Sequence, residues 1–159
     1  MNNYWHTNYR AAQGGDFTFR YVLTSAATLE PEALTRLGFE SMRPVEMNYV
    51  VGQDKPGNPE RPLPPEGAGF LETDQPDVAL ITWKQAEDGD GVILRLQETA
   101  GRATNATLRF PRETVRSANV CSGVEDNGGS MTPNGNAVTV KLGAWEVATV
   151  RVRLGRPRL

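Results

Sequence analysis

Short stretches of alternating apolar and polar residues recur from residue 69 onward. They predict seven strands, at residues 69–72, 78–85, 92–97, 104–110, 115–120, 137–142 and 145–154. Turn-forming segments rich in Gly, Asn and Asp separate several of them, at 87–91, 99–101, 126–129 and 134–136. Short strands with such turns between them are typical of an antiparallel β-sandwich. The predicted fold is therefore all-β.

The first 51 residues carry a different pattern. At 17–23 large apolar or aromatic residues (Phe17, Phe19, Tyr21 and Leu23) alternate with Thr18, Arg20 and Val22, which predicts a half-buried strand, and residues 47–51 predict another. Pro31 suits the first turn of a helix, and Gly38 can end one. Between them Ala33, Leu34 and Leu37 share one helical face. We expect one short helix near residues 31–37.

A proline-rich segment follows at residues 52–68 and contains five of the eleven prolines. Proline fixes φ and lacks the N–H that a ladder needs, so this segment is an extended linker or a surface loop. The chain then divides into 1–51, the linker 52–68, a sandwich at 69–154 and a tail at 155–159. The alternative is one long loop over a single sandwich.

Composition narrows the class of protein. The chain has 17 basic and 19 acidic residues, a balance that argues against a general nucleic-acid binder. One cysteine, Cys121, excludes an internal disulfide, and one histidine, His6, excludes a multi-histidine metal site. We find no signal-peptide pattern and no apolar run near the ~20 residues of a spanning helix, so we expect a cytoplasmic protein without membrane contact.

A run of aromatic and amide side chains near the N-terminus is the candidate binding surface. Aromatic faces stack on the C–H surface of a pyranose ring, and Asn amides both donate and accept hydrogen bonds. The candidate residues are Asn3, Tyr4, Trp5, His6 and Asn8, with Tyr9 beside them. A core strand with aromatic packing is the alternative, and composition alone favours it. His6 lacks the partners that a zinc site or a general base needs.

Other conspicuous residues have structural interpretations. The acidic segment 87–91 lacks the ligand spacing of an EF-hand and is expected to be a hairpin turn. We expect Cys121 to be a small buried residue, and the Asn105 sequon to be incidental. Trp83 and Trp145 lie inside strand patterns and are assigned to the core. Arg151 and Arg153 alternate with apolar residues and are expected on the wet face of a final edge strand.

Several segments resemble α-mannosidases of glycoside hydrolase family 38. Residues 2–9, 13–15 and 17–21 are similar to the end of that family's large β-domain. Residues 69–71, 84–89, 94–99 and 146–150 are similar to its last β-sandwich. The first segment and residues 84–99 are the more specific matches.

The resemblance implies a retaining glycosidase that cleaves α-mannosides. In the family an aspartate nucleophile and a zinc ion held by His and Asp lie in an N-terminal α/β barrel. No motif matching those groups occurs in this sequence, so we assign no catalytic residue, no metal ligand and no cofactor to the chain. Zinc is implied only for the catalytic domain.

The resemblance therefore predicts a non-catalytic C-terminal β-domain that supports the catalytic barrel of the same enzyme. The run of candidate residues at 3–8 would help line the sugar cleft, with mannosides as ligands. Self-association through a sheet edge or apolar face is a further expectation. Two alternatives stay open at this point: an independent carbohydrate-binding module and a protein-interaction domain.

Overall fold

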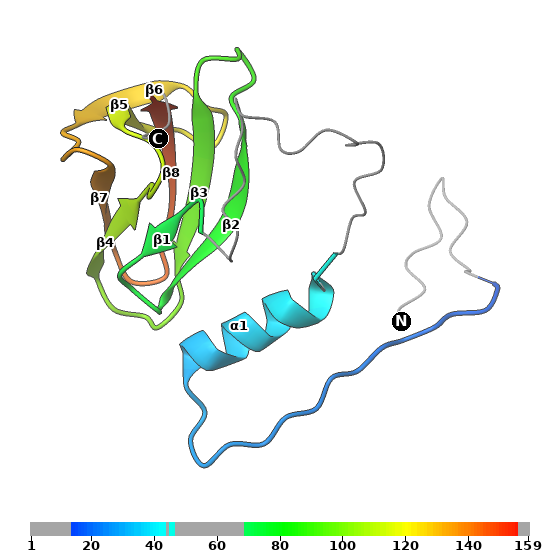
Figure 1. Cartoon of the computed structure of the whole chain (residues 1–159). Coiled ribbons are helices and arrows are strands. Elements are labelled where there is room, and N and C mark those ends of the chain that lie inside the picture. The colour runs from blue at the N-terminus through cyan, green and yellow to red at the C-terminus, as the bar shows by residue number, and fades with distance from the viewer. Residues whose placement is uncertain (1–13, 44, 47–68, 156–159) are drawn as a thin grey trace, which may run out of the picture.

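A computed structural model describes residues 14–43, 45–46 and 69–155 (Figure 1). The expected strand at 47–51 and the linker at 52–68 lie outside the described residues. The described part contains one helix and eight strands. They are α1 (Pro31–Met42), β1 (Glu72–Thr73), β2 (Val78–Gln85), β3 (Val92–Glu98), β4 (Thr104–Arg109), β5 (Val115–Cys121), β6 (Asn127–Met131), β7 (Ala137–Leu142) and β8 (Val147–Leu154).

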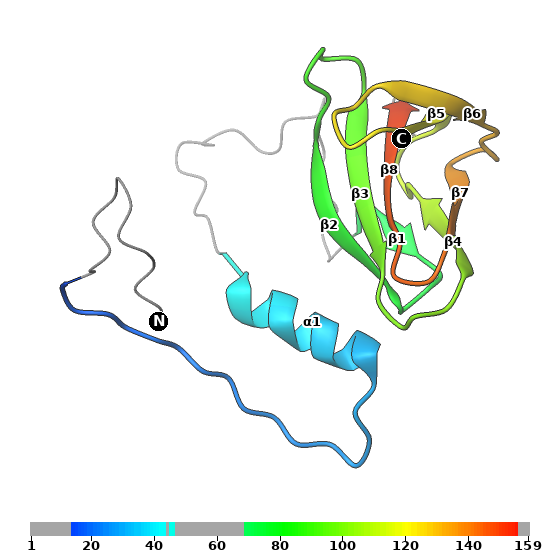
Figure 2. The same cartoon turned by 180° about the vertical axis from the view of Figure 1, so that it is seen from behind.

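The strands form two antiparallel sheets that pack face to face. The smaller sheet has the order β1-β4-β7 and the larger the order β2-β3-β8-β5-β6. Figure 2 shows β3 and β8 in the middle of the larger sheet. Hairpins join β2 to β3 and β5 to β6, whereas the other connections cross from one sheet to the other. The predicted all-β sandwich is confirmed.

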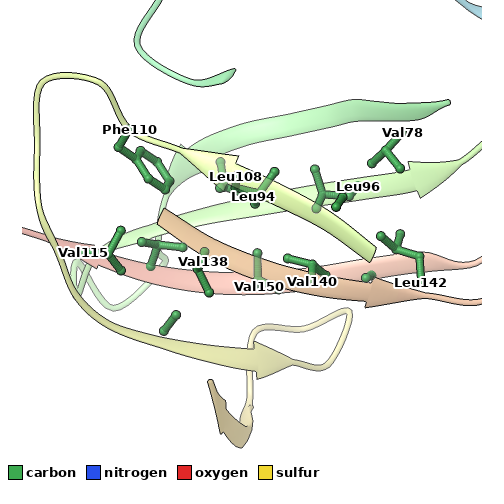
Figure 3. Close-up of a cluster of buried hydrophobic side chains, with 14 residues drawn as sticks. Val78, Leu94, Leu96, Leu108, Phe110, Val115, Val138, Val140, Leu142 and Val150 are labelled. Carbon is green, nitrogen blue, oxygen red and sulfur yellow. The ribbon is translucent and has the colours of Figure 1, made fainter. Parts of the chain in front are cut away.

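The core lies between the two sheets (Figure 3). Leu108 and Val140 of the smaller sheet face Leu94 and Val150 of the larger one, and all four are at most 2% exposed. Burying a side chain of this kind contributes about 1.5–3 kcal/mol. The alternation in β7, where Val138 and Val140 are buried and Thr139 is exposed, follows from the two-residue period of a strand.

The final strand is not an edge strand, so the expected position of its arginines is wrong. β8 pairs with β3 on one side and β5 on the other. The alternation itself holds, because Val150 and Val152 belong to the core. Arg151, however, is only 3% exposed, because two loops cover the outer face of the larger sheet there. The sequence pattern shows the two faces of a strand but not what covers the outer one.

Trp83 and Trp145 are not in the core, which corrects a second expectation. Trp83 lies on the edge strand β2, is 38% exposed and meets Phe110 edge-on with ring centroids 6.1 Å apart. Trp145 lies in the turn before β8 and is 60% exposed. Trp145 lies only two residues before β8, so the apolar pattern of the sequence extends the predicted strand to include it.

The expected turn at 126–129 is also wrong. The chain turns at 122–126, and Asn127–Met131 form β6. The strand contains Gly128 and Gly129, and because glycine is typical of turns the sequence predicts a turn here. A Cβ added at Gly128 would lie 3.1 Å from the carbonyl oxygen of Val120, so glycine here permits close approach of the neighbouring strand.

The N-terminal expectations are met only in part. A helix is present, but α1 continues through Gly38 to Met42, and its last backbone hydrogen bond runs from Arg43 N–H to Phe39 O. Residues 17–23 do not form a strand; they are extended, without a partner strand among the described residues. Tyr21 is 81% exposed. Periodicity predicts the shape of such a segment, but a strand also needs a neighbour.

Candidate functional site

The residues predicted to bind sugar lie outside the described part of the chain. This holds for Asn3, Tyr4, Trp5, His6 and Asn8 alike. Their role in a sugar cleft therefore stays a prediction. The described residues offer three other places where polar chemistry gathers: one end of the sandwich, the outer face of the larger sheet, and a concavity between the sheets.

A buried carboxylate organises one end of the sandwich. Glu98, the last residue of β3, is fully buried. Its carboxylate accepts backbone N–H groups from the following turn, at 2.7 Å from Ala100, 2.8 Å from Gly101 and 3.2 Å from Arg102. It also accepts the N–H of Trp145, at 2.9 Å, from the turn before β8. One side chain thus fastens two turns that are far apart in sequence.

The hydrogen bonds keep this carboxylate charged. Burial of Glu98 by itself raises the pKa of the carboxyl. The hydrogen bonds from Trp145 and the turn residues act in the opposite direction, and together they outweigh burial, so the pKa lies below the ordinary value of 4.5. Glu98 is therefore ionised at neutral pH, which strengthens each of its hydrogen bonds.

The same network fixes an exposed aromatic side chain. Trp145 has φ of 61°, a left-handed conformation that is uncommon for residues other than glycine. Its indole lies directly against the backbone of Gly101, where an added Cβ would be 2.7 Å from the indole Cζ2. Gly101 itself has φ of 74°. The carboxylate of Glu98 accepts the backbone N–H groups of both residues and so stabilises their left-handed conformations.

Asp77 adds a second buried acid at this end. The side chain is 2–3% exposed, and its Oδ2 lies 3.1 Å from Nε of Arg102, whose own side chain is 67% exposed. The backbone oxygen of Asp77 accepts both the N–H and the hydroxyl of Thr99, at 2.8 and 2.9 Å. The ion pair with Asp77 orients the guanidinium of Arg102, and most of the Arg102 side chain stays exposed to solvent.

The outer face of the larger sheet holds an ionic network. Nη1 of Arg151 lies 2.7 Å from both carboxylate oxygens of Asp88, and Nη2 donates to the carbonyl of Glu125 at 3.1 Å. Nε of Arg153 donates to Asp90 at 2.8 Å. The hydrogen bond to Asp88 raises the pKa of Arg151 above its ordinary value. The acidic segment 87–91 is thus the expected hairpin turn, and it binds arginine.

Glu125 joins the two covering loops. Its φ is 71°, and its Oε2 accepts the N–H of Glu87 at 2.9 Å. Its Oε1 lies 2.6 Å from Nζ of Lys84. The hydrogen bond from Lys84 is the main reason why the pKa of Glu125 is below its ordinary value. In the described part of the chain, His, Cys, Asp and Glu form no group of three that could hold a metal ion.

A concavity of about 660 Å³ opens where β5 and β6 diverge from β7 and the start of β8. Val120, Val140 and Ala148 supply apolar surface, and Thr139 and Lys141 supply polar groups. Its size is that of a small-molecule site. The described residues that line it include no aromatic side chain. It therefore offers no stacking surface for a sugar ring.

The two remaining sequence expectations can be placed. Cys121 is buried, as expected, at the end of β5. Asn105 is exposed on β4. The thiol of Cys121 lies 3.5 Å from Oδ1 of Asn127 and interacts with the guanidinium of Arg151.

Sequence reasoning missed the Glu98–Trp145 pair. The strand pattern 145–154 includes Trp145, whereas Glu98 falls between the predicted strand 92–97 and the predicted turn 99–101. Each residue adjoins a turn with glycine, at Gly101 and Gly143. An acidic residue that ends an apolar strand just before a glycine turn is a usable signal, because free backbone N–H groups gather in such a turn. That the turn before β8 meets the turn after β3 could not be read from the sequence.

Two antiparallel sheets that pack face to face define the class of the described residues 69–155 as a β-sandwich domain. Comparison with protein-family models then identifies it. Residues 77–150 match the family described as "Glycosyl hydrolases family 38 C-terminal beta sandwich domain". This match confirms the resemblance to the last β-sandwich of family 38 over these residues. No curated protein sequence matches the chain. In the described residues, no helix is long and apolar enough to cross a membrane.

Proposed function

We propose that this chain is a non-catalytic C-terminal region of an α-mannosidase-like glycoside hydrolase and that it braces the catalytic barrel. The family match at residues 77–150 is the observation that carries the proposal. The match covers most of the sandwich, from just before β2 into β8. The ion pairs of Arg151 and the hydrogen bonds of Glu98 serve the fold, as expected for a supporting domain.

The N-terminal part of the described chain supports an assembly with other polypeptide. Phe19, Tyr21, Leu23 and Leu29 are each more than half exposed. Isolated soluble domains rarely expose large apolar side chains in such close sequence. Contact with the β-rich body of the same enzyme would remove these side chains from water.

In this proposal the residues at the very start of the chain face the sugar cleft. Asn3, Tyr4, Trp5, His6 and Asn8 would contact the mannoside by stacking and hydrogen bonds. Replacing Trp5 by alanine in the assembled enzyme should raise KM for an α-mannoside. Unchanged kinetics in a normally folded Trp5→Ala enzyme would remove these residues from the cleft.

Zinc belongs to the catalytic barrel in this proposal. The sequence has one histidine, and the described residues bring no metal-binding group of acids together. The chain alone should therefore not hydrolyse 4-nitrophenyl α-mannoside, with or without added zinc. It should form a complex with a separately expressed family 38 catalytic barrel, measured by size-exclusion chromatography with light scattering. Turnover by the chain alone, or no complex with the barrel, would contradict the proposal.

An independent carbohydrate-binding module is the second candidate function. One observation favours it: the side chain of Trp145 is 60% exposed, while its backbone N–H is held by Glu98. A module of this kind would bind mannosides without the barrel, so a sugar titration of the chain separates the two functions.

A further inference from the structure

We propose that Trp145 is the stacking surface of a carbohydrate-binding site at the end of the sandwich. The site is formed by the turns that follow β3 and precede β8, which meet at the same end of the molecule (Figure 1). The ligand class is a hexopyranoside, whose apolar C–H face lies on the indole. This choice of ligand rests on the proposed function, since a glycosidase domain works beside glycans.

Trp145 adopts a strained backbone conformation. Its φ of 61° lies where a bulky residue rarely occurs, and such a conformation costs about 1–3 kcal/mol. Glycine or asparagine at this position would avoid most of that cost. A core role would explain a strained tryptophan, but this side chain is 60% exposed. The strain therefore keeps an aromatic ring at the surface.

Trp145 is also preorganised for a ligand. The backbone N–H of Trp145 is held by the buried carboxylate of Glu98, and the Nε1, Cε2 and Cζ2 atoms of the indole lie against Gly101, which has no Cβ to displace them. A ring fixed in this way loses little conformational freedom when a ligand stacks on it. Loops at one end of a β-sandwich are also where such domains carry their binding sites.

The two turns that carry Trp145 and Gly101 also expose polar chemistry. The exposed neighbours in the two turns are Arg102 and Glu146, which carry charged groups, and the small residues Ala103 and Ala144. Asp77 orients the guanidinium of Arg102 without covering it. Guanidinium donors and carboxylate acceptors match sugar hydroxyls, while the indole matches the C–H face.

These surroundings favour a sugar over a protein surface. A stable protein interface buries about 1,000 Å² or more around a cluster of apolar anchors. Apart from Trp145, the exposed residues of the two turns are charged or small. Val147, the next large apolar residue, pairs with Gln97 on the outer face of the larger sheet rather than in the turn.

The test is a titration of the whole chain with methyl α-mannopyranoside, followed through the indole Nε1–H resonances. The chain has three tryptophans, and the spectrum of a Trp145→Asn variant assigns the resonance of Trp145. Asparagine tolerates positive φ, so this variant should keep the fold. We expect a saturable shift of the Trp145 resonance at millimolar sugar, and an affinity that is about tenfold weaker in Trp145→Asn.

Trp83→Phe is the matched control, and it should leave the affinity unchanged. The proposal is overturned if the Trp145 resonance does not shift, if glycerol shifts it equally, or if Trp145→Asn binds the sugar as tightly as the original chain. Should Trp145→Asn not fold, the Trp5→Phe and Trp83→Phe variants together assign the remaining indole resonance to Trp145, and the titration of the unmodified chain still decides. A chain that binds the barrel but shows no Trp145 shift would overturn this site alone and leave the supporting function in place.

Discussion

At the scale of single residues, Glu98 connects local chemistry to the shape of one end of the molecule. Its carboxylate takes four backbone N–H groups that would otherwise need water or other partners. An amide in its place has only one oxygen to accept them, so Glu98→Gln should loosen both turns. The charged form is the stabilising one, because the hydrogen bonds lower the pKa of this group.

The pH dependence follows from that direction. A carboxyl whose pKa is lower in the folded than in the unfolded state stabilises the fold above its unfolded value, here near 4.5, and loses that contribution as pH falls through the folded value. We expect Glu98→Gln to melt below the original chain at pH 7, with a difference that shrinks as pH falls below about 4.5. Thermal unfolding followed by circular dichroism between pH 7 and pH 3 measures this.

The exposed residue Glu72 gives the control. Glu72→Gln should melt as the original chain does at each pH, because this side chain lies on the surface at β1. A Glu98→Gln difference that stays constant down to pH 3 would show that charge at Glu98 does not stabilise the fold.

At the scale of elements, the middle strands of the larger sheet are buried on both faces. In β3, Leu94 points into the sandwich and Ile93 to the outer face, yet both are at most 1% exposed. Ile93 pairs with Arg151, which the loops at 86–91 and 122–126 cover. At this point the outer face of the larger sheet is therefore shielded from solvent, as its inner face is.

A pair of substitutions tests this. Ile93→Ala should destabilise the fold about as much as Leu94→Ala, by about 2–5 kcal/mol each, because both leave a cavity. Val124→Ala, at a residue 79% exposed, should change stability by less than about 0.5 kcal/mol. Urea unfolding measures all three. If Ile93→Ala behaves like Val124→Ala, the loops do not close over the sheet.

How much of each element could be predicted depends on what defines it. The bounds of β2 and β7 follow from alternation and from the turns around them, so they match the structure. The strand β6 could not be predicted, because Gly128 permits the close approach of β5 and does not form a turn. The helix passes Gly38 because a glycine weakens a helix by about 1 kcal/mol without ending it.

At the scale of the whole molecule, the core cluster comes entirely from residues between Val78 and Val152. A chain of residues 69–159 should therefore fold by itself and melt within a few degrees of the full chain. Circular dichroism and a thermal melt check this. A large loss of stability in the shorter chain would mean that the N-terminal part belongs to the same folding unit.

The sequence predicted the all-β class well but the candidate site poorly, for one physical reason. Periodicity reports which face of a strand is apolar, and that was enough for the core. A site depends on which turns meet, as Glu98 and Trp145 do across 47 residues, and on which side chains stay exposed. Those contacts are set by the packing of the sheets and not by local pattern.

The buried Arg151 also bears on how this protein can be modified. Because its guanidinium binds both the 86–91 loop and the 122–126 loop, the two loops are interlocked. An inserted epitope or a fluorescent label in either loop would displace the other loop and expose Arg151 to solvent. The connection at 132–136 makes none of these hydrogen bonds to Arg151, so it is the better place to attach a reporter.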